Sequence, residues 1–257
     1  MDKGRKTKMD KRILIASPVH QKEEIFKEYL FSLNKLLIPS NCEVNYFFIL
    51  HNCKILSKYL RKDQYIEYNN NINLNKEEGQ QKQWEIENYN IVADMRTKIL
   101  QKAREEKYDY LFMVDSDVLL HPKTLSLFLK YNKDIIASLS WTKLNNSSSI
   151  DANCAQYEGW NKYNDIEIFK KPNLYKVGWT GRCTLISSKI FSNPNISYYQ
   201  IPGVDNTGSE DYAFCLRCYC NFPDLKIYFD TMLPSRHLYQ EKDYKRWIKE
   251  KSEIFKI

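Results

Sequence analysis

The stretch that decides the fold is Tyr108-Asp109-Tyr110-Leu111-Phe112-Met113-Val114-Asp115-Ser116-Asp117. Its short apolar run, bounded by charge, predicts a buried β-strand. Pro122, a few residues later, is typical of the first turn of a helix. A strand that ends in this way delivers Asp115 and Asp117 to the carboxyl edge of a parallel sheet, where open α/β sheets bind their ligands.

Two carboxylates at such an edge suit Mg²⁺ or Mn²⁺, because these ions take few protein carboxylates and complete their coordination with water or phosphate. An Asp-x-Asp triplet also occurs by chance, as a solvated turn with Asp in a capping position. The triplet alone therefore does not distinguish a metal site from a simple turn, and other motifs of the chain are needed.

Length and composition indicate one substantial domain. The 257 residues are 43% hydrophobic and 28% charged, which is ordinary for a soluble globular protein. No apolar stretch approaches the roughly 20 residues that span a bilayer, and residues 1–12 are charged without a following secretory core. We expect a basic disordered tail over 1–12, a catalytic domain over 13–240, an amphipathic helix over 241–257, and a cytoplasmic location.

The net charge of +7 comes from the two ends of the chain. Residues 1–12 carry +4 and residues 236–257 carry +3, so residues 13–235 are formally neutral. A general basic face for nucleic acid is therefore not expected, although a locally basic pocket for phosphates fits the same distribution.

Seven cysteines are present, and Cys215, Cys218 and Cys220 are close enough in sequence to suggest zinc. No second Cys or His pair stands at zinc-site spacing, and this segment is expected to be helical. Free thiols in a reducing compartment are the better interpretation.

Alternating strands and helices predict a parallel sheet with covering helices. A polar loop is expected over 69–83. The expected strands are 13–16, 44–50, 108–114, 134–139, a run ending at 186, and 226–229. The expected helices are 23–37, a short one ending at 60, 87–107, 122–131, 209–220 and 242–255. Residues 17–20, 140–173 and 230–239 are expected to be loops or irregular.

Several polar residues stand at suggestive positions in this pattern. Arg96 lies next to the apolar stripe of its helix, where it could hold a phosphate or a carboxylate, although a solvated Arg would look the same. Gly178 and Gly181 indicate a tight turn or a backbone close to a ligand. Ser209 is a plausible N-cap, and Glu210-Asp211 would suit the first helical turn without any catalytic role.

Aromatic residues interleaved with amides and hydroxyls mark residues 140–173. Trp141, Tyr157 and Trp160 could stack on sugar rings while neighbouring groups bind the sugar hydroxyls. A surface insertion without a chemical role is the alternative.

The order of these motifs resembles the GT-A glycosyltransferases, specifically the family 2-like inverting enzymes, from about Ile13 to His237. The resemblance implies an α/β fold, GT-A (Rossmann-like), with a mixed, mostly parallel central sheet flanked by helices. Asp115-Ser116-Asp117 resembles the metal-binding Asp-x-Asp motif, and Glu210-Asp211 resembles the acidic pair that supplies the catalytic base.

The resemblance also assigns roles to individual residues. Asp117 and the late His237 would bind Mn²⁺ or Mg²⁺. Asp211 would be the catalytic base, with Glu210 orienting the acceptor or the base. The expected donor-binding residues are Ser17, Pro18, Arg96, Asp115, Ser116 and Arg182. The expected acceptor-binding residues are Trp141, Trp160 and Trp179.

The implied reaction moves one sugar from a nucleoside-diphosphate sugar, with a UDP-sugar as the expected donor, to a hydroxyl acceptor with inversion. The acceptor would be a carbohydrate, a lipid-linked molecule or a protein. His51-Asn52-Cys53 lacks the acidic, serine-rich turn usual after the second strand, which weakens any prediction of base recognition. The signature of processive synthases after the acidic pair is also missing, which favours single addition.

Two other functions fit parts of the pattern. A nucleotidyltransferase would need a glycine- and lysine-rich phosphate loop, which residues 17–20 do not supply. A non-catalytic sugar- or nucleotide-binding module would use the carboxylates structurally. The C-terminal helix could pack on the sheet, close over the donor, or lie on the inner face of an anionic membrane.

Overall fold

The computed structural model describes residues 11–72, 86–143, 150–161, 163, 165–204, 209–239 and 241–254. Residues 1–10 of the expected tail, most of the expected polar loop at 69–83, and residues 255–257 of the expected C-terminal helix lie outside the described residues.

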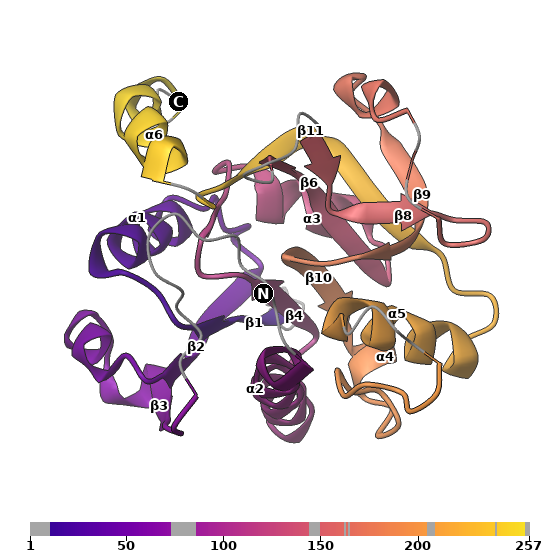
Figure 1. Cartoon of the computed structure of the whole chain (residues 1–257), viewed down its shortest axis with the longest axis horizontal. Coiled ribbons are helices and arrows are strands. Elements are labelled where there is room, and N and C mark those ends of the chain that lie inside the picture. The colour runs from indigo at the N-terminus through magenta and orange to yellow at the C-terminus, as the bar shows by residue number, and fades with distance from the viewer. Residues whose placement is uncertain are drawn as a thin grey trace, which may run out of the picture.

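Strands and helices alternate along the first part of the chain, as expected, and strands dominate its second part (Figure 1). The elements are β1 (Lys11–Val19), α1 (Glu23–Asn34), β2 (Cys42–His51), η1 (Lys54–Tyr59), η2 (Lys62–Gln64), β3 (Tyr65–Tyr68), α2 (Ile86–Glu105), β4 (Tyr110–Val114), β5 (Val118–Leu119), α3 (Thr124–Tyr131), β6 (Ile135–Lys143), β7 (Ile150–Ala152), β8 (Cys154–Gln156), η3 (Glu167–Lys170), β9 (Leu174–Thr180), β10 (Cys183–Ser187), α4 (Ser188–Phe191), α5 (Glu210–Asn221), β11 (Ile227–His237) and α6 (Glu241–Ile254).

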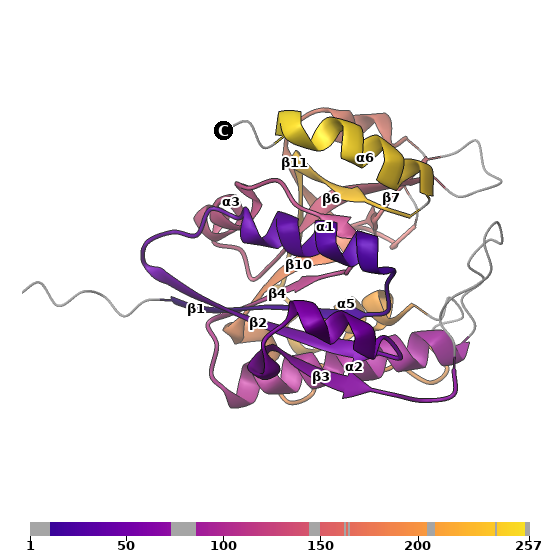
Figure 2. The ribbon, with the colours of Figure 1, turned by 90° about the vertical axis from the view of Figure 1, so that its left-hand side faces the viewer.

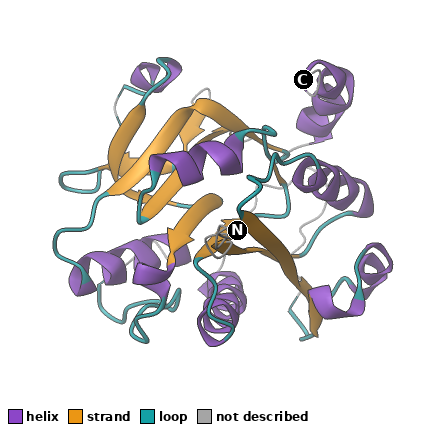
Figure 3. Ribbon diagram, turned by 180° about the vertical axis from the view of Figure 1, so that it is seen from behind, coloured by secondary structure: helices purple, strands orange, loops and turns teal. Residues whose placement is uncertain are grey.

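One mixed sheet with the order β3-β2-β1-β4-β10-β6-β11-β9-β8 forms the centre of the protein. The four strands from β3 to β4 are parallel, and β10 then runs antiparallel to both β4 and β6. Strands β6 and β11 pair in parallel, while β9 and β8 complete the far edge in antiparallel pairs. Figure 3 shows the helices on both faces of this sheet.

Successive residues of the central strands point to opposite faces, so each strand contributes to two hydrophobic cores. Leu111 and Met113 pack with α2, α4 and α5, whereas Phe112 and Val114 pack with α1 and α3. All four of these β4 side chains are essentially inaccessible to solvent. The stretch before Asp115 is therefore the buried strand that its apolar run predicts.

Two expected loops are strand in the structure. Ser17 and Pro18 belong to β1, where Pro18 lies opposite Ile49 of the parallel neighbour β2. Residues 230–237 continue β11 beyond the expected strand at 226–229. Local composition was misleading because Pro234 cannot donate a ladder hydrogen bond, and the structure accommodates it in a register shift between Asp230 and Ser235.

The prediction of an irregular segment over 140–173 was also wrong in part. Strand β6 extends to Lys143, and β7 and β8 add short antiparallel pairs to β6 and β9. These strands depend on partners far along the chain, which local composition does not reveal. Strand β8 consequently forms the edge of the sheet beside β9, and β7 lies beside β6.

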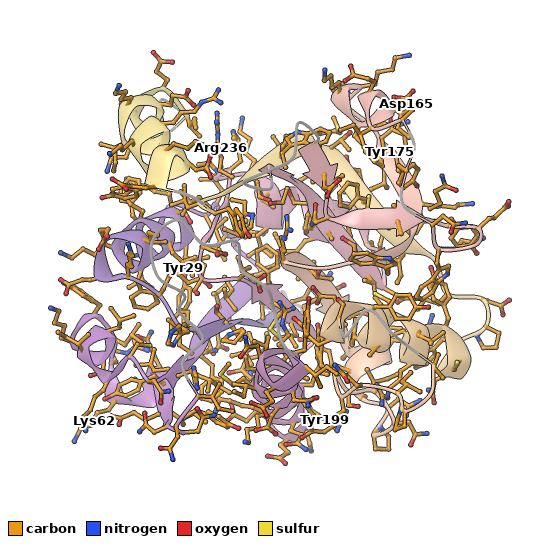
Figure 4. The ribbon with its side chains drawn as sticks, in the orientation of Figure 1. Tyr29, Lys62, Asp165, Tyr175, Tyr199 and Arg236 are labelled. Atoms are coloured by element: carbon orange, nitrogen blue, oxygen red, sulfur yellow. The ribbon has the colours of Figure 1, made fainter. Side chains whose placement is uncertain are left out.

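Helix α6 packs against α1 (Figure 2). Trp247 is 2% exposed, and its Nε1 donates to Glu28 Oε2 at 2.7 Å. Several basic side chains of α6 and of nearby β11 form ion pairs, including Arg236 with Glu250 at 3.0 Å, and Figure 4 shows Arg236 beside the helix. Trp247 is thus the apolar residue of α6 that packing buries, whereas Ile248 stays 40% exposed. Among the described residues, no helix has the length and apolarity to cross a bilayer.

Candidate active site

A cavity of about 440 Å³ opens at the carboxyl ends of β1 and β4 and beside the start of α5. It brings together most of the site residues expected from the sequence, which are Pro18, Arg96, Asp115, Ser116, Asp117, Trp179, Arg182, Glu210, Asp211 and His237. Three expected residues do not line it, namely Ser17, Trp141 and Trp160. A single polar cavity at this sheet edge is the position that the fold class favours for a ligand.

The Asp115-Ser116-Asp117 turn is held by its backbone on several sides. Asp115 N donates to Arg182 O at 2.7 Å, and Val118 N donates back to Asp115 O at 3.0 Å. The strand before the turn is fixed from α1, because the Tyr29 hydroxyl donates to Val114 O at 3.2 Å (Figure 4). These hydrogen bonds fix the backbone from which the side chains of Asp115 and Asp117 extend.

The extension of β11 places His237 beside this turn. His237 pairs with Val118 of β5, and Leu238 N donates to Asp117 O at 2.8 Å. As a result His237 Nε2 lies 3.5 Å from Asp117 Oδ2. The segment expected to be a loop is therefore the element that delivers the predicted histidine.

Asp117 and His237 fit the divalent ion that the resemblance implies. A carboxylate oxygen and an imidazole nitrogen are both ligands that Mn²⁺ accepts, and phosphate oxygens or water complete its shell. Within the described part of the chain, no group of three or more His, Cys, Asp or Glu side chains could hold a metal by itself. An ion held by Asp117 and His237 would therefore complete its coordination with other oxygen ligands, such as phosphate or water.

The charge balance of the cavity also suits a cation. Its guanidinium groups are Arg96 and Arg182, and its five carboxylates belong to Asp115, Asp117, Asp151, Glu210 and Asp211. Burial raises the pKa of Asp115 to about 7, and neighbouring carboxylates add to this rise although Arg96 opposes it. A divalent cation bound beside these carboxylates would favour their ionised forms.

Arg96 lies at the centre of the carboxylates and is 3% exposed. Its Nη2 donates to Asp115 Oδ1 at 2.7 Å, and its Nη1 donates to Asp211 Oδ1 at 2.8 Å. Its Nε lies 3.5 Å from Glu210 Oε1. The sequence left phosphate and carboxylate open as partners of Arg96, and in this structure the partners are carboxylates.

The acidic pair begins α5, and Ser209 is its N-cap as predicted, accepting from Tyr212 N at 3.5 Å. Burial raises the pKa of Glu210 to about 8, and the nearby Asp211 adds to the rise. Burial also raises the pKa of Asp211, but Arg96 and Arg182 oppose this. Arg96 opposes the rise for Glu210 as well, but Asp211 has Arg182 as a second opposing guanidinium, which favours Asp211 as the proton acceptor of the two.

The two glycines approach other parts of the protein closely. A Cβ atom added to Gly181 would overlap the Asp211 carboxylate, and one added to Gly178 would overlap the Gln156 carbonyl and the Trp160 ring. Between β9 and β10 the chain turns tightly, with Cys183 N donating to Gly181 O at 2.9 Å and Arg182 at φ 69°. The tight turn that was one of the two predicted alternatives is present, and its backbone at Gly181 passes close to Asp211.

Only one of the three expected acceptor tryptophans, Trp179, lines the cavity. Trp160 packs edge-on against Tyr212 and Tyr219, with ring centroids 5.0 and 5.3 Å away. Trp141 is partly buried against the core. In this structure the two rings outside the cavity contribute to packing.

Sequence reasoning missed several cavity residues. Those with aromatic, amide or acidic side chains are His20, Gln21, Tyr89, Asp151, Asn153 and Tyr163. Asn153 is 4% exposed and donates to Gly181 O at 2.9 Å, so it supports the turn beside Asp211. Only His20 carried a usable signal, because it closely follows Ser17-Pro18 at the end of the first strand.

Comparison with known sequences also indicates a glycosyltransferase. Residues 44–239 match the family model described as glycosyltransferase family 25, N-terminal domain. Procollagen galactosyltransferase 1-A of Xenopus laevis is 25% identical over 156 residues, which is 60% of this chain. The match covers 25% of that protein, so the chain corresponds to about a quarter of the relative's length.

Structural comparison supports the fold. The structure of GalNAc-T7 with UDP, GalNAc and Mn²⁺ is similar, with a TM-score of 0.52 and 14% identity over 94% of this chain and 48% of that one. The inositol-1-phosphate CTP transferase from T. maritima has a TM-score of 0.48 and 11% identity over 97% and 98% of the two chains, which is too low to support an argument. The predicted GT-A fold with a mixed, mostly parallel sheet is confirmed.

Proposed function

Because the chain belongs to glycosyltransferase family 25, we propose that it transfers one sugar from a nucleoside-diphosphate sugar to a hydroxyl acceptor, with inversion and with Mn²⁺ or Mg²⁺. UDP-galactose is the first donor to test, because the Xenopus relative is named a galactosyltransferase and GalNAc-T7 was solved with UDP. The acceptor is proposed to be a hydroxyl of a carbohydrate, a lipid-linked molecule or a protein.

One observation carries the proposal: one cavity is lined both by Asp117 with the adjacent His237 and by Asp211. The first pair would hold the ion, which when bound supplies positive charge next to the leaving diphosphate. Asp115, Ser116, Pro18 and Arg182 line the same cavity and are proposed to contact the donor.

Asp211 is proposed to take the proton from the acceptor hydroxyl as its oxygen attacks C1 of the sugar. The bond from C1 to the diphosphate breaks as the new bond forms, so the proton ends on Asp211 and the negative charge on the diphosphate. Attack from the face opposite the leaving group inverts the configuration at C1. Trp179 is proposed to position the acceptor, because it is the expected aromatic residue that lines the cavity.

The nucleotidyltransferase alternative lacks a specific observation in its favour. The end of β1 and the residue after it read Ser17-Pro18-Val19-His20. This sequence contains no glycine or lysine and therefore does not form a glycine- and lysine-rich phosphate loop. The non-catalytic alternative is opposed by membership in an enzyme family.

A panel of nucleotide sugars, incubated with and without Mn²⁺ and with simple glycoside acceptors, tests the proposal. We expect transfer or slow donor hydrolysis with one nucleotide sugar only, lost on chelation and restored by Mn²⁺. NMR of the product should show an inverted anomeric centre. Binding of nucleotide sugars without hydrolysis or transfer across the panel would contradict the enzymatic proposal, and retention of configuration would contradict inversion.

A further inference from the structure

Arg96 joins parts of the site that are far apart in the sequence. It lies in the middle of α2, and its partners stand at the end of β4 and at the start of α5. In Figure 1 α2 lies beside α5 and close to β4. One guanidinium thus connects the donor-side Asp115 with the proposed base Asp211.

The guanidinium is also fixed from a direction away from the carboxylates. Arg96 Cζ lies 5.4 Å from the centroid of the Tyr198 ring, and this ring stacks on Phe214 at 4.4 Å with an interplanar angle of 9°. Tyr198 is 1% exposed, and its backbone N–H donates to the hydroxyl of Thr97, the residue after Arg96. Packing therefore leaves the guanidinium little freedom to turn.

The terminal nitrogens of Arg96 are both engaged by carboxylates of the protein. A guanidinium binds a phosphate bidentately only when its fork faces that phosphate. Here the fork divides between Asp115 and Asp211, so protein carboxylates set its direction. Each terminal nitrogen keeps one further N–H, but the side chain is only 3% exposed. The guanidinium of Arg96 therefore bridges the carboxylates of Asp115 and Asp211.

We propose that Arg96 is a positioning residue, which orients Asp211 toward the acceptor hydroxyl and links it to Asp115, and which does not bind the donor directly. This inference rests on the proposed function, because it concerns how that reaction's base is held. Its positive charge also favours the ionised form of Asp211 that can accept a proton.

Arg96→Lys and Arg96→Met test the proposal, with Arg104→Lys as the matched control. A lysine keeps the charge but cannot bridge two carboxylates as a guanidinium does. Arg104 lies on the same helix and donates to the backbone carbonyls of Phe191 and Asn193, away from the cavity. The control therefore removes a partly buried guanidinium without changing the contacts of Arg96 with Asp115 and Asp211.

Three quantities separate a positioning role from donor binding: kcat, the Kd for UDP with Mn²⁺ by calorimetry, and the pKa of Asp211 from NMR of labelled carboxyl carbons. For Arg96→Lys we expect kcat to fall on the order of 100-fold, the range of a misplaced general base. The Kd for UDP should stay within about threefold of the wild-type value. Arg96→Met should raise the pKa of Asp211, and Arg104→Lys should leave all three quantities unchanged.

A Kd for UDP weakened by about tenfold or more, with an unchanged Asp211 pKa, would show that Arg96 binds the donor and would overturn the proposal. If Arg96→Met fails to fold, Arg96→Lys still decides between these outcomes. If the wild-type protein transfers no sugar at all, the proposed function fails, while the NMR titration still reports whether Arg96 controls Asp211.

Discussion

Gly181 packs against Asp211 so closely that a Cβ atom on Gly181 would lie 2.9 Å from Asp211 Oδ1 and still closer to Oδ2. Neither the backbone of Gly181 nor that of Gly178 has a positive φ, so the requirement for glycine here is space. Asp211, the carboxylate proposed to accept the proton, thus lies against the backbone of Gly181 and accepts a hydrogen bond from Arg96.

Gly181→Ala should therefore displace Asp211. We expect a loss of stability of about 1–3 kcal/mol from overpacking, together with a fall in kcat that exceeds any change in the Kd for UDP. Gly203→Ala is the control, because a Cβ there meets no atom within 4 Å and only its φ of +77° is unfavourable. A Gly181→Ala enzyme with normal kcat would show that the Asp211 position is not critical.

Asp211→Asn should abolish proton acceptance while keeping the shape of the side chain. We expect kcat to fall by roughly 10² to 10⁴, with UDP binding nearly intact in calorimetry. Glu210→Gln should retain more activity, because Glu210 is already protonated at neutral pH, with a pKa of about 8. Equal losses in the two variants would contradict the assignment of Asp211 as the base.

Asp117→Ala should remove the Mn²⁺ dependence of UDP binding, because Asp117 and His237 form the pair that fits the ion. His237→Ala should weaken Mn²⁺ binding in the same calorimetric titration. Asp134→Asn is a suitable control, since Asp134 pairs with Lys189 outside the cavity. Unaltered Mn²⁺-dependent binding by Asp117→Ala would exclude Asp117 from the site.

Much of the fold could be predicted because it depends on local patterns. The apolar run before Asp115 and the four-residue spacing around Arg96 predicted a buried strand and a helix, and both form. The family match confirms the predicted glycosyltransferase. The Ser209 cap was also readable, because capping involves residues only a few positions apart.

The rest of the site depends on contacts that no local pattern carries. The register shift before Ser235 lets β11 continue to His237, and it relies on Ser138 of β6, whose hydroxyl accepts from Ser235 N at 3.0 Å. Gly181 was predicted to form a tight turn or to lie close to a ligand, and only the structure identifies Asp211 as its close neighbour. The partners of Arg96 lie 19 and 115 residues away, which explains why its role could not be read from its own helix.

Glu210 should make the stability of the folded protein depend on pH. Its pKa is raised from an ordinary value of 4.5 to about 8, chiefly by burial. Between these values the folded state binds more protons than the unfolded state, so the free energy of unfolding falls as pH rises. The stability that this pKa shift contributes is fully present below about pH 4.5 and is lost as pH rises through about 8.

Comparison of the wild-type protein with Glu210→Gln isolates this contribution. Gln keeps the shape and has no proton to lose, so the variant should be more stable relative to wild type as pH increases from 5 to 8. The difference should grow at no more than ~1.4 kcal/mol per pH unit, the limit for one proton. Asp115, with its own pKa raised to about 7, leaves a residual dependence in both proteins. Urea denaturation at several pH values measures the difference, and two parallel curves would show that Glu210 is ionised in the folded protein throughout this range.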